Sequence, residues 1–267
     1  MICSLRVTSR QIKYFERPRN VLSRSRISQG LGRSRRDEGL CGQASAGSIM
    51  IERLETVVLR GAEAHAADWF RRNLGEELGS STTRFRAVFA GAGRRLGDQE
   101  PLMGPDDLAG LRQAGLVAPE RWRLAMFARA ALLVRALDAL PADEHPNFLR
   151  ELYRRGDFRE QSAILQSLIL LPRPERFVTL AVEACRTNVG DVFEAIACEN
   201  IYPATHFADL NFNQLVIKAF FVGIAVGRIA GLKERKTAEL RRMAADYASE
   251  RRAAGRSVPG DIDLVLG

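Results

Sequence analysis

The chain lacks the motifs that would assign it to a well-known enzyme class. Its 267 residues contain no Walker A loop, no GxSxG nucleophile elbow and no HExxH zinc motif. The four cysteines form no CxxC pair and are too widely spaced for a secreted disulfide framework, which favours a reducing compartment. We expect no metal site and no cofactor, and whether the protein is an enzyme at all stays open.

Long apolar runs are also missing. The longest uncharged apolar stretches, residues 161–172 and 219–227, are shorter than the roughly 18 residues that a membrane-spanning helix needs. We therefore expect no membrane span. No alternating pattern of apolar and polar residues is long enough to predict a β-strand.

The net charge of +8 suggests a nucleic-acid partner at first sight. Residues 1–49, however, hold 10 basic and 3 acidic residues, whereas residues 50–267 hold 30 and 29. The excess positive charge therefore belongs to the first segment, and we expect no nucleic-acid partner for the rest of the chain.

Residues 1–49 mix Arg, Ser, Gly and Gln without a hydrophobic period, which is typical of a disordered segment. Four interpretations remain open for this basic leader. A mis-assigned start is one, because Met50 opens an amphipathic pattern. An organelle transit peptide, a basic arm for nucleic acid and an inert tail are the others.

From Met50 the apolar residues recur with the 3.6-residue period of an α-helix. The pattern predicts a helix from Met50, helices over residues 84–96, 105–116 and 119–140, one capped by Asp157, one from Phe177 and one over residues 234–254. The fold class is therefore all-α, with residues 50–267 as a single domain of stacked antiparallel helices, either a HEAT-like array or an irregular helical bundle.

One segment, residues 183–218, places polar residues among large apolar ones. On a continuous helix, Glu183, Thr187 and Glu194 would lie near one face. Lys218 follows a run of apolar residues, so we expect its ammonium group to pair with Glu183 or Glu194. The candidate ligand-binding residues are Glu183, Arg186, Thr187, Asn188, Glu194, Glu199, Asn200, Tyr202, His206, Asn213, Gln214 and Lys218.

Most of these residues also have a purely structural interpretation. Asn188 and Asp209 could cap helices, and Glu183 with Arg186 could be a surface ion pair. Capping does not explain Gln214 and Lys218, which is why a shared polar pocket is weighed against a structural network.

Four motifs in this segment, EACRTN (183–188), FEAIA (193–197), ENIYP (199–203) and NQLVIK (213–218), resemble those of the EboA-domain family. The resemblance extends from about Met50 to Arg256, with Phe212 where a tryptophan would be expected. It implies a cytoplasmic helical protein from a gene cluster that makes or exports a secondary metabolite, such as the precursor of scytonemin. It assigns no catalytic residue.

Three functional hypotheses follow. The first is an accessory protein that binds a small polar metabolite, or a partner protein of the same cluster, at residues 183–218. The second is an unrecognised enzyme with Glu183 or Glu194 as general base and Lys218 or Arg186 stabilising an anion. The third is a helical scaffold in which the motifs serve only packing.

Overall fold

The structure is a computed structural model that describes residues 46–74 and 82–267. These residues form α-helices, short 3-10 helices and no β-strand, which confirms the all-α fold class. Residues 44–267 make up one compact unit. The prediction of a disordered leader falls mainly on residues 1–45, outside the described part of the chain.

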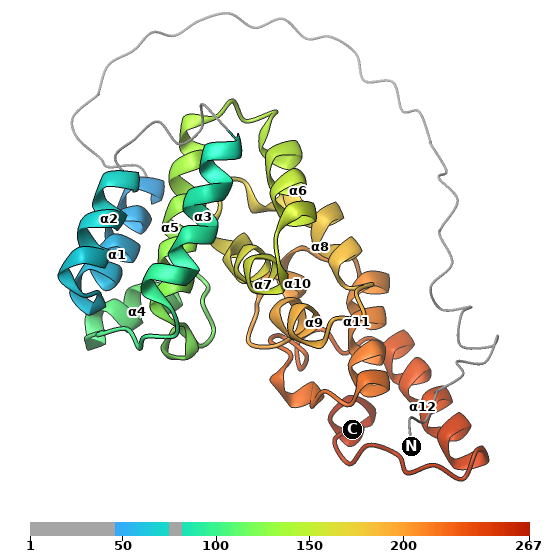
Figure 1. The fold of residues 1–267 in the computed structure, drawn as a ribbon. Helices are drawn as coiled ribbons and strands as arrows, with labels where there is room; N and C mark the ends of the chain where they lie inside the picture. The colour runs from blue at the N-terminus through green and yellow to red at the C-terminus, as the bar shows by residue number, and fades with distance from the viewer. Residues whose placement is uncertain (1–45, 75–81) are drawn as a thin grey trace, which may run out of the picture. The chain divides into compact units, whose positions relative to one another are not determined.

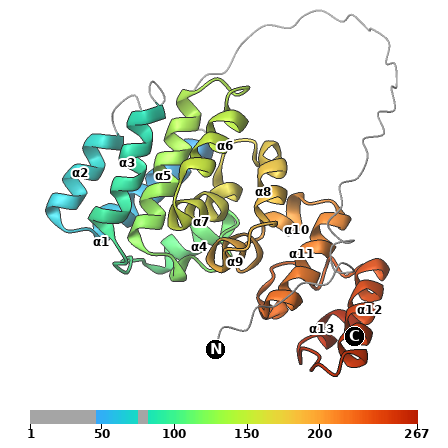
Figure 2. The ribbon, with the colours of Figure 1, turned by 45° about the vertical axis from the view of Figure 1, so that its right-hand side comes forward.

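The helices follow one another with short connections (Figures 1 and 2). The α-helices are α1 (Ala46–Gly61), α2 (Ala64–Leu74), α3 (Thr82–Leu96), α4 (Pro105–Gln113), α5 (Leu124–Ala139), α6 (His145–Arg155), α7 (Phe158–Ser167), α8 (Val178–Ala184), α9 (Gly190–Ala197), α10 (Tyr202–His206), α11 (Asp209–Val222), α12 (Ala238–Ala253) and α13 (Asp263–Leu266). The 3-10 helices are η3 (Pro119–Arg121), η4 (Leu168–Leu170), η5 (Pro174–Phe177) and η6 (Val226–Arg228).

Helix α5 forms the centre of the first half of this unit. It is rich in Ala and Leu and is apolar on nearly every side, so most of its residues are buried. It packs against α1, α3 and α7, and the stacking then continues from α7 to α9, from α9 to α11 and from α11 to α12. The HEAT-like repeat stays a prediction.

A buried arginine marks the close contact between α3 and α5. Arg129 is 5% exposed, donates from Nε to the carbonyl oxygen of Phe89 at 3.2 Å and lies over the Phe89 ring at 5.4 Å. A β-carbon at Gly93 would lie 2.7 Å from its Nη2 atom. A β-carbon at position 93 would therefore require the guanidinium group to shift.

Several predicted helix ends agree with the structure. Asp157 caps α7, since its Oδ1 atom accepts a hydrogen bond from the amide of Glu160 at 2.8 Å, and the Glu160 carboxylate accepts one from the amide of Asp157 at 3.1 Å. Pro105 opens α4. The first helix begins at Ala46, four residues before Met50.

Other boundaries differ from the predictions. Residues 119–140 do not form one helix, because Pro119 opens the 3-10 helix η3 and α5 starts only at Leu124. The last long helix begins at Ala238 rather than 234, because Thr237 accepts a hydrogen bond from the amide of Leu240 at 3.0 Å and caps it. Helix α6 was not predicted, and its first residue, His145, is buried.

Candidate functional site

The motif segment is divided among four helices, of which α8, α9 and α10 are short and α11 has 14 residues. The prediction of a continuous helix through Glu183 and Glu194 is wrong, because α8 ends at Ala184 and α9 begins at Gly190. Between them the Thr187 hydroxyl accepts a hydrogen bond from the amide of Val189 at 3.1 Å. Such local bonds offer the backbone an alternative to the helix. Glu183 and Glu194 therefore lie on different elements.

Lys218 on α11 is the most buried charged group of the segment, with 9% exposure. Its Nζ atom donates to the carbonyl oxygens of Cys185, at 2.6 Å, and Thr187, at 2.5 Å. The ammonium also lies 4.7 Å from the centre of the Phe193 ring. Burial lowers the pKa of Lys218, and the neighbouring Cys185 opposes this shift.

The predicted carboxylate partner of Lys218 was therefore wrong. Within the described ranges its ammonium forms no ion pair, and the carbonyls of Cys185, at the end of α8, and Thr187, in the turn that follows, take the place of a carboxylate. The last carbonyls of a helix lack partners inside the helix and carry partial negative charge. Lys218 donates hydrogen bonds to such carbonyls and so holds the turn between α8 and α9 against α11.

Asn200 organises the turn between α9 and α10. Its Nδ2 atom donates to the carbonyl oxygens of Leu165, at 3.1 Å, and Ala195, at 2.9 Å. Its Oδ1 atom accepts from the amide of Tyr202 at 3.0 Å. Because Asn200 is buried, these three bonds take the place of hydrogen bonds to water. They also connect α7, α9 and α10.

Tyr202 and His206 extend this buried network. The Tyr202 hydroxyl donates to the carbonyl oxygen of Pro174 at 2.7 Å, and burial raises the pKa of this phenol. The His206 ring lies 4.6 Å from the Tyr202 ring, and its Nε2 atom is buried without a hydrogen-bond partner. Burial lowers the pKa of His206, with Glu175 opposing the shift. The imidazole is thus kept neutral more readily than in water.

Glu194 and Glu199 converge on Arg228 of η6. Arg228 binds Glu199 with Nε and Nη2, both at 2.9 Å, and Glu194 with Nη1 at 2.8 Å. Arg121 adds a 2.8 Å bond to Glu199. The hydrogen bonds from Arg228 hold the pKa of Glu199 below its ordinary value, despite the opposing effect of burial.

This ion cluster also stabilises a left-handed backbone. Glu199 has a φ of 47°, a conformation that costs a residue with a β-carbon about 1 kcal/mol. The amide of Glu199 donates to the carbonyl oxygen of Arg228 at 2.9 Å. Backbone and side-chain bonds to one arginine therefore hold the strained residue in place.

The remaining candidates differ in their burial. Glu183, Arg186 and Asn188 are exposed, and Thr187 and Gln214 are partly exposed. Asn213 is buried and donates to the hydroxyl of Thr237 at 3.3 Å, while its Oδ1 atom has no hydrogen-bond partner. A single pocket formed by Glu183, Arg186, Asn188, Gln214 and Lys218 stays a prediction.

Two residues of the ion cluster, Arg121 and Arg228, lie outside residues 183–218 and were not predicted from the sequence. Arginine is common in this chain, so neither residue stood out in the sequence. Only the fold shows that Arg121 of η3 and Arg228 of η6 meet at Glu199.

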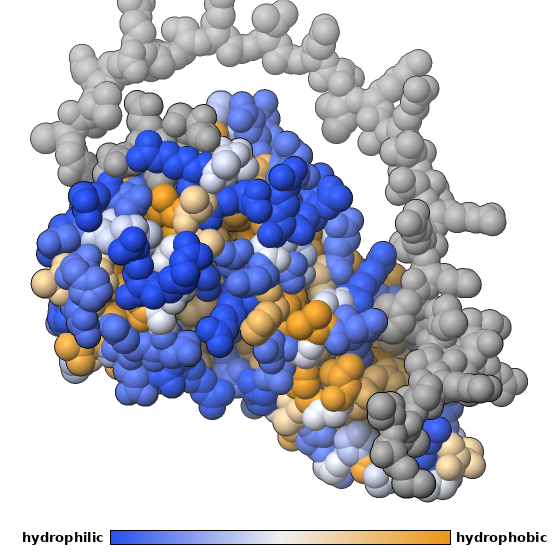
Figure 3. All heavy atoms as spheres, viewed as in Figure 1, coloured by the Kyte–Doolittle hydropathy of each residue, from blue (hydrophilic) through white to orange (hydrophobic). Residues whose placement is uncertain are grey.

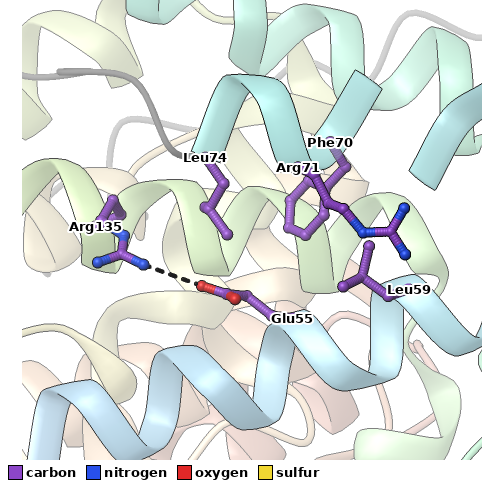
Figure 4. A pocket seen from close by; sticks show the side chains of 6 residues that line it. All are labelled: Glu55, Leu59, Phe70, Arg71, Leu74 and Arg135. Carbon is purple, nitrogen blue, oxygen red and sulfur yellow. Dashed lines mark hydrogen bonds and ion pairs between the residues drawn. The ribbon is translucent and has the colours of Figure 1, made fainter. Parts of the chain in front are cut away.

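Two hollows lie away from the motif segment. The first, between α1, α2 and α5, has a volume of about 160 Å³ and contains the 3.2 Å ion pair of Arg135 with Glu55 (Figure 4). The second, between α3 and α6, has a volume of about 580 Å³. It is lined by Thr82, Thr83, Arg86, Leu140, Asp143, Glu144, Asn147, Phe148, Glu151 and Arg155.

The described residues offer few groups suited to covalent or metal chemistry. None of their His, Cys, Asp and Glu side chains form a group of three that could hold a metal ion. Cys185 and Cys198 are buried, and burial raises the pKa of their thiols to about 12 and about 11. Thiols with such values are weak nucleophiles at neutral pH. No helix in the described ranges combines the length and apolar character needed to cross a membrane.

Comparison with family models identifies the region from Met50 onward. Residues 50–266 match the family model described as metabolite traffic protein EboA. The matched region includes the whole motif segment and both hollows. No curated protein and no solved structure matches the chain.

Proposed function

The chain belongs to the EboA family of metabolite traffic proteins, and we propose that it acts by binding: it holds a small polar metabolite and passes it between proteins of one biosynthetic or export cluster. The observation that carries this proposal is that several charged groups of the motifs bind other groups of the same protein. Lys218 binds backbone carbonyls, and Glu194 and Glu199 bind Arg228. The motifs thus provide a rigid support rather than a catalytic set.

The rival enzyme hypothesis requires groups that are free to react. A general base must reach the substrate proton, and an anion-stabilising cation must face the developing charge. Glu194 is engaged by Arg228, and Lys218 is 9% exposed with its ammonium directed to two carbonyls. Binding without chemistry therefore fits the contacts of Glu194 and Lys218 better than general base catalysis, whereas Glu183 and Arg186 are exposed.

We further propose that the exposed part of the motif segment contacts the partner protein. Glu183, Arg186 and Asn188 are exposed, and Val189 beside them is 45% exposed. An apolar side chain bordered by polar ones suits a transient interface. The partner in this proposal is a protein of the same cluster, of the scytonemin-precursor type, and the location is the cytoplasm.

Mass spectrometry of small molecules that co-purify with the protein tests this function. We expect one polar metabolite in stoichiometric amount from the producing host, and its release unchanged when the protein is denatured. Conversion of that metabolite by the purified protein would instead support the enzyme hypothesis. Recovery of partner proteins without any small molecule would support a scaffold.

A variant separates the partner surface from the rest. Arg186→Glu should weaken the recovery of pathway proteins while the melting temperature stays the same, because Arg186 is exposed and has no ion pair with the described residues. Arg252→Glu, on α12, is the matched surface control. Equal recovery with both variants would contradict a partner surface at Arg186.

A further inference from the structure

The hollow between α3 and α6 has the size of a ligand site. Its volume is about 580 Å³, within the range of roughly 300 to 1,000 Å³ found for small-molecule pockets. The hollow between α1, α2 and α5, at about 160 Å³, is too small for a metabolite of several functional groups. None of the family motifs quoted above lies in the lining of the larger hollow.

The base of this hollow is fixed by aromatic packing. Phe148 on α6 lines it and is 8% exposed, and its ring meets that of Phe85 on α3 edge to face, at 5.1 Å between centres. Such ring pairs are worth about 1 kcal/mol beyond the area they bury. The two helices therefore keep a defined spacing at the hollow. Figure 3 shows mainly hydrophilic residues over α3 and α6, whereas apolar residues gather over α9 and α11.

One charged pair in the lining is satisfied internally. Glu151 accepts hydrogen bonds from Arg154 and Arg155, both at 3.3 Å and both on α6. The charge of Glu151 is thus balanced by neighbours on its own helix. This part of the hollow therefore offers a ligand little attraction through Glu151.

Arg86 and two carboxylates differ from this pair. Arg86 on α3 lines the hollow, is partly buried and forms no hydrogen bond or ion pair with the described residues. The side chains of Asp143 and Glu144, in the turn before α6, also form none within the described ranges. A guanidinium group and two carboxylates without partners among the described residues thus border the same cavity. In the motif segment, by contrast, Lys218, Glu194 and Glu199 are bonded within the fold.

We propose that this hollow binds a small zwitterionic metabolite, one that carries both an acidic group and an amine. Arg86 binds the carboxylate or phosphate, since guanidinium groups form paired hydrogen bonds with these anions. Asp143 or Glu144 binds the amine. Thr82, Thr83 and Asn147 offer further hydrogen bonds, and Phe148 contacts the carbon skeleton. The site would serve the metabolite-binding function proposed above and rests on that function only for its biological purpose.

Titration of the full chain by heteronuclear NMR tests the site directly. The probes are the standard amino acids, added one at a time, with acetate and methylammonium as single-charge analogues. At least one amino acid should shift the amide signals of α3 and α6 and bind at least tenfold more tightly than either analogue, because two charges are recognised together.

Variants assign the two ends of the ligand. Arg86→Gln should weaken binding of that amino acid about tenfold, and Asp143→Asn combined with Glu144→Gln should do the same. Arg94→Gln is the matched control, because Arg94 is an exposed arginine on the same helix that does not line the hollow. Methylammonium binding should survive Arg86→Gln, and acetate binding should survive the double carboxylate change.

Three results would overturn the proposal. Shifts confined to other helices would place the ligand elsewhere. Equal binding of an amino acid and a single-charge analogue would show that the two charges are not recognised together. Equal loss with Arg86→Gln and Arg94→Gln would mean that general surface charge is responsible. The co-purification experiment tests the binding function independently of this site. If the metabolite still co-purifies with the Arg86→Gln variant, the binding function stands and this site is refuted.

Discussion

Two regions of this protein differ in how several of their charged residues are bonded. In the motif segment from α8 to α11, Lys218, Glu194 and Glu199 all find partners inside the fold. Along the hollow between α3 and α6, Arg86, Asp143 and Glu144 have no side-chain partner among the described residues.

The comparison shows that a segment with a distinctive sequence need not be the one whose charged groups can reach a ligand. Short helices with tight turns leave many backbone groups without helical partners, and α8, α9 and α10 are all short. Polar side chains must satisfy these groups, which makes the segment distinctive. The hollow lies between α3 and α6, of 15 and 11 residues, in which terminal groups are a smaller share of the helix. Arg86, Asp143 and Glu144 have no side-chain partner among the described residues, although their sequence context is ordinary.

The largest effect expected in the motif segment is that of Asn200→Ala. This change removes three buried hydrogen bonds, each worth about 1 kcal/mol net, and leaves the carbonyl oxygens of Leu165 and Ala195 without this donor. We expect the free energy of unfolding to fall by about 3 kcal/mol, measured by chemical denaturation. Asn188→Ala, at an exposed position, should cost under about 0.5 kcal/mol. Equal losses would contradict a structural role specific to Asn200.

Lys218→Met should cost about 2 kcal/mol, because two carbonyl oxygens lose a charged donor while the methionine regains some apolar burial. No carboxylate is left unpaired, so adding Glu183→Gln or Glu194→Gln should not restore stability. Lys233→Met, at an exposed lysine, is the control. Recovery in a double variant, measured by denaturation, would show that Lys218 has a carboxylate partner after all.

The ion cluster predicts a smaller, pH-dependent effect. The lowered pKa of Glu199 means that the unfolded chain binds its proton more readily, so stability from this group rises with pH. It should be complete above the ordinary pKa of about 4.3 and be lost as the pH falls through the lower folded value. Glu199→Gln should therefore cost about 1 kcal/mol at neutral pH and progressively less in acid.

Thermal unfolding across this pH range, with Glu183→Gln as the control, measures the effect. Glu183 is exposed and forms no ion pair within the described ranges, so its replacement should leave the pH profile unchanged. A wild-type and a Glu199→Gln profile that run parallel down to pH values below about 4 would contradict this account.

The smallest effect on stability is expected at the hollow. Arg86→Gln should change the free energy of unfolding by under about 0.5 kcal/mol, because Arg86 has no partner to lose among the described residues. Denaturation without any ligand is the relevant measurement. A loss above about 1 kcal/mol would show that Arg86 supports the fold, and would end the contrast between the two regions.

Parts of the fold could be predicted because they depend on neighbouring residues. The apolar period identified helices that the structure places at α1, α3, α4, α5, α7 and α12, and local chemistry predicted the cap at Asp157. Helix α6 was not predicted, because its first turn contains Pro146, a residue that also commonly stands in turns. The break after Ala184 escaped prediction because EACRTN contains no proline or glycine to end a helix.

The candidate site was less accessible to prediction. The sequence singled out Asn200, Tyr202 and Lys218 as unusual, and the structure places all three in buried hydrogen-bond networks. The partners could not be predicted. Most are backbone carbonyls, which every residue has, and the others are arginines distant in sequence.

The sequence by itself determined the helical class and the family, because both are encoded in local patterns: the apolar period and the four motifs between residues 183 and 218. The tertiary structure decided which charged groups are satisfied and which remain available. Lys218 follows apolar residues and suggested a pocket, yet packing of α11 against the end of α8 gives it two carbonyl partners. Arg86 looked like any other arginine, and the spacing of α3 and α6 leaves it facing a cavity. Whether a charge finds a partner depends on contacts between distant segments, which only the folded chain brings together.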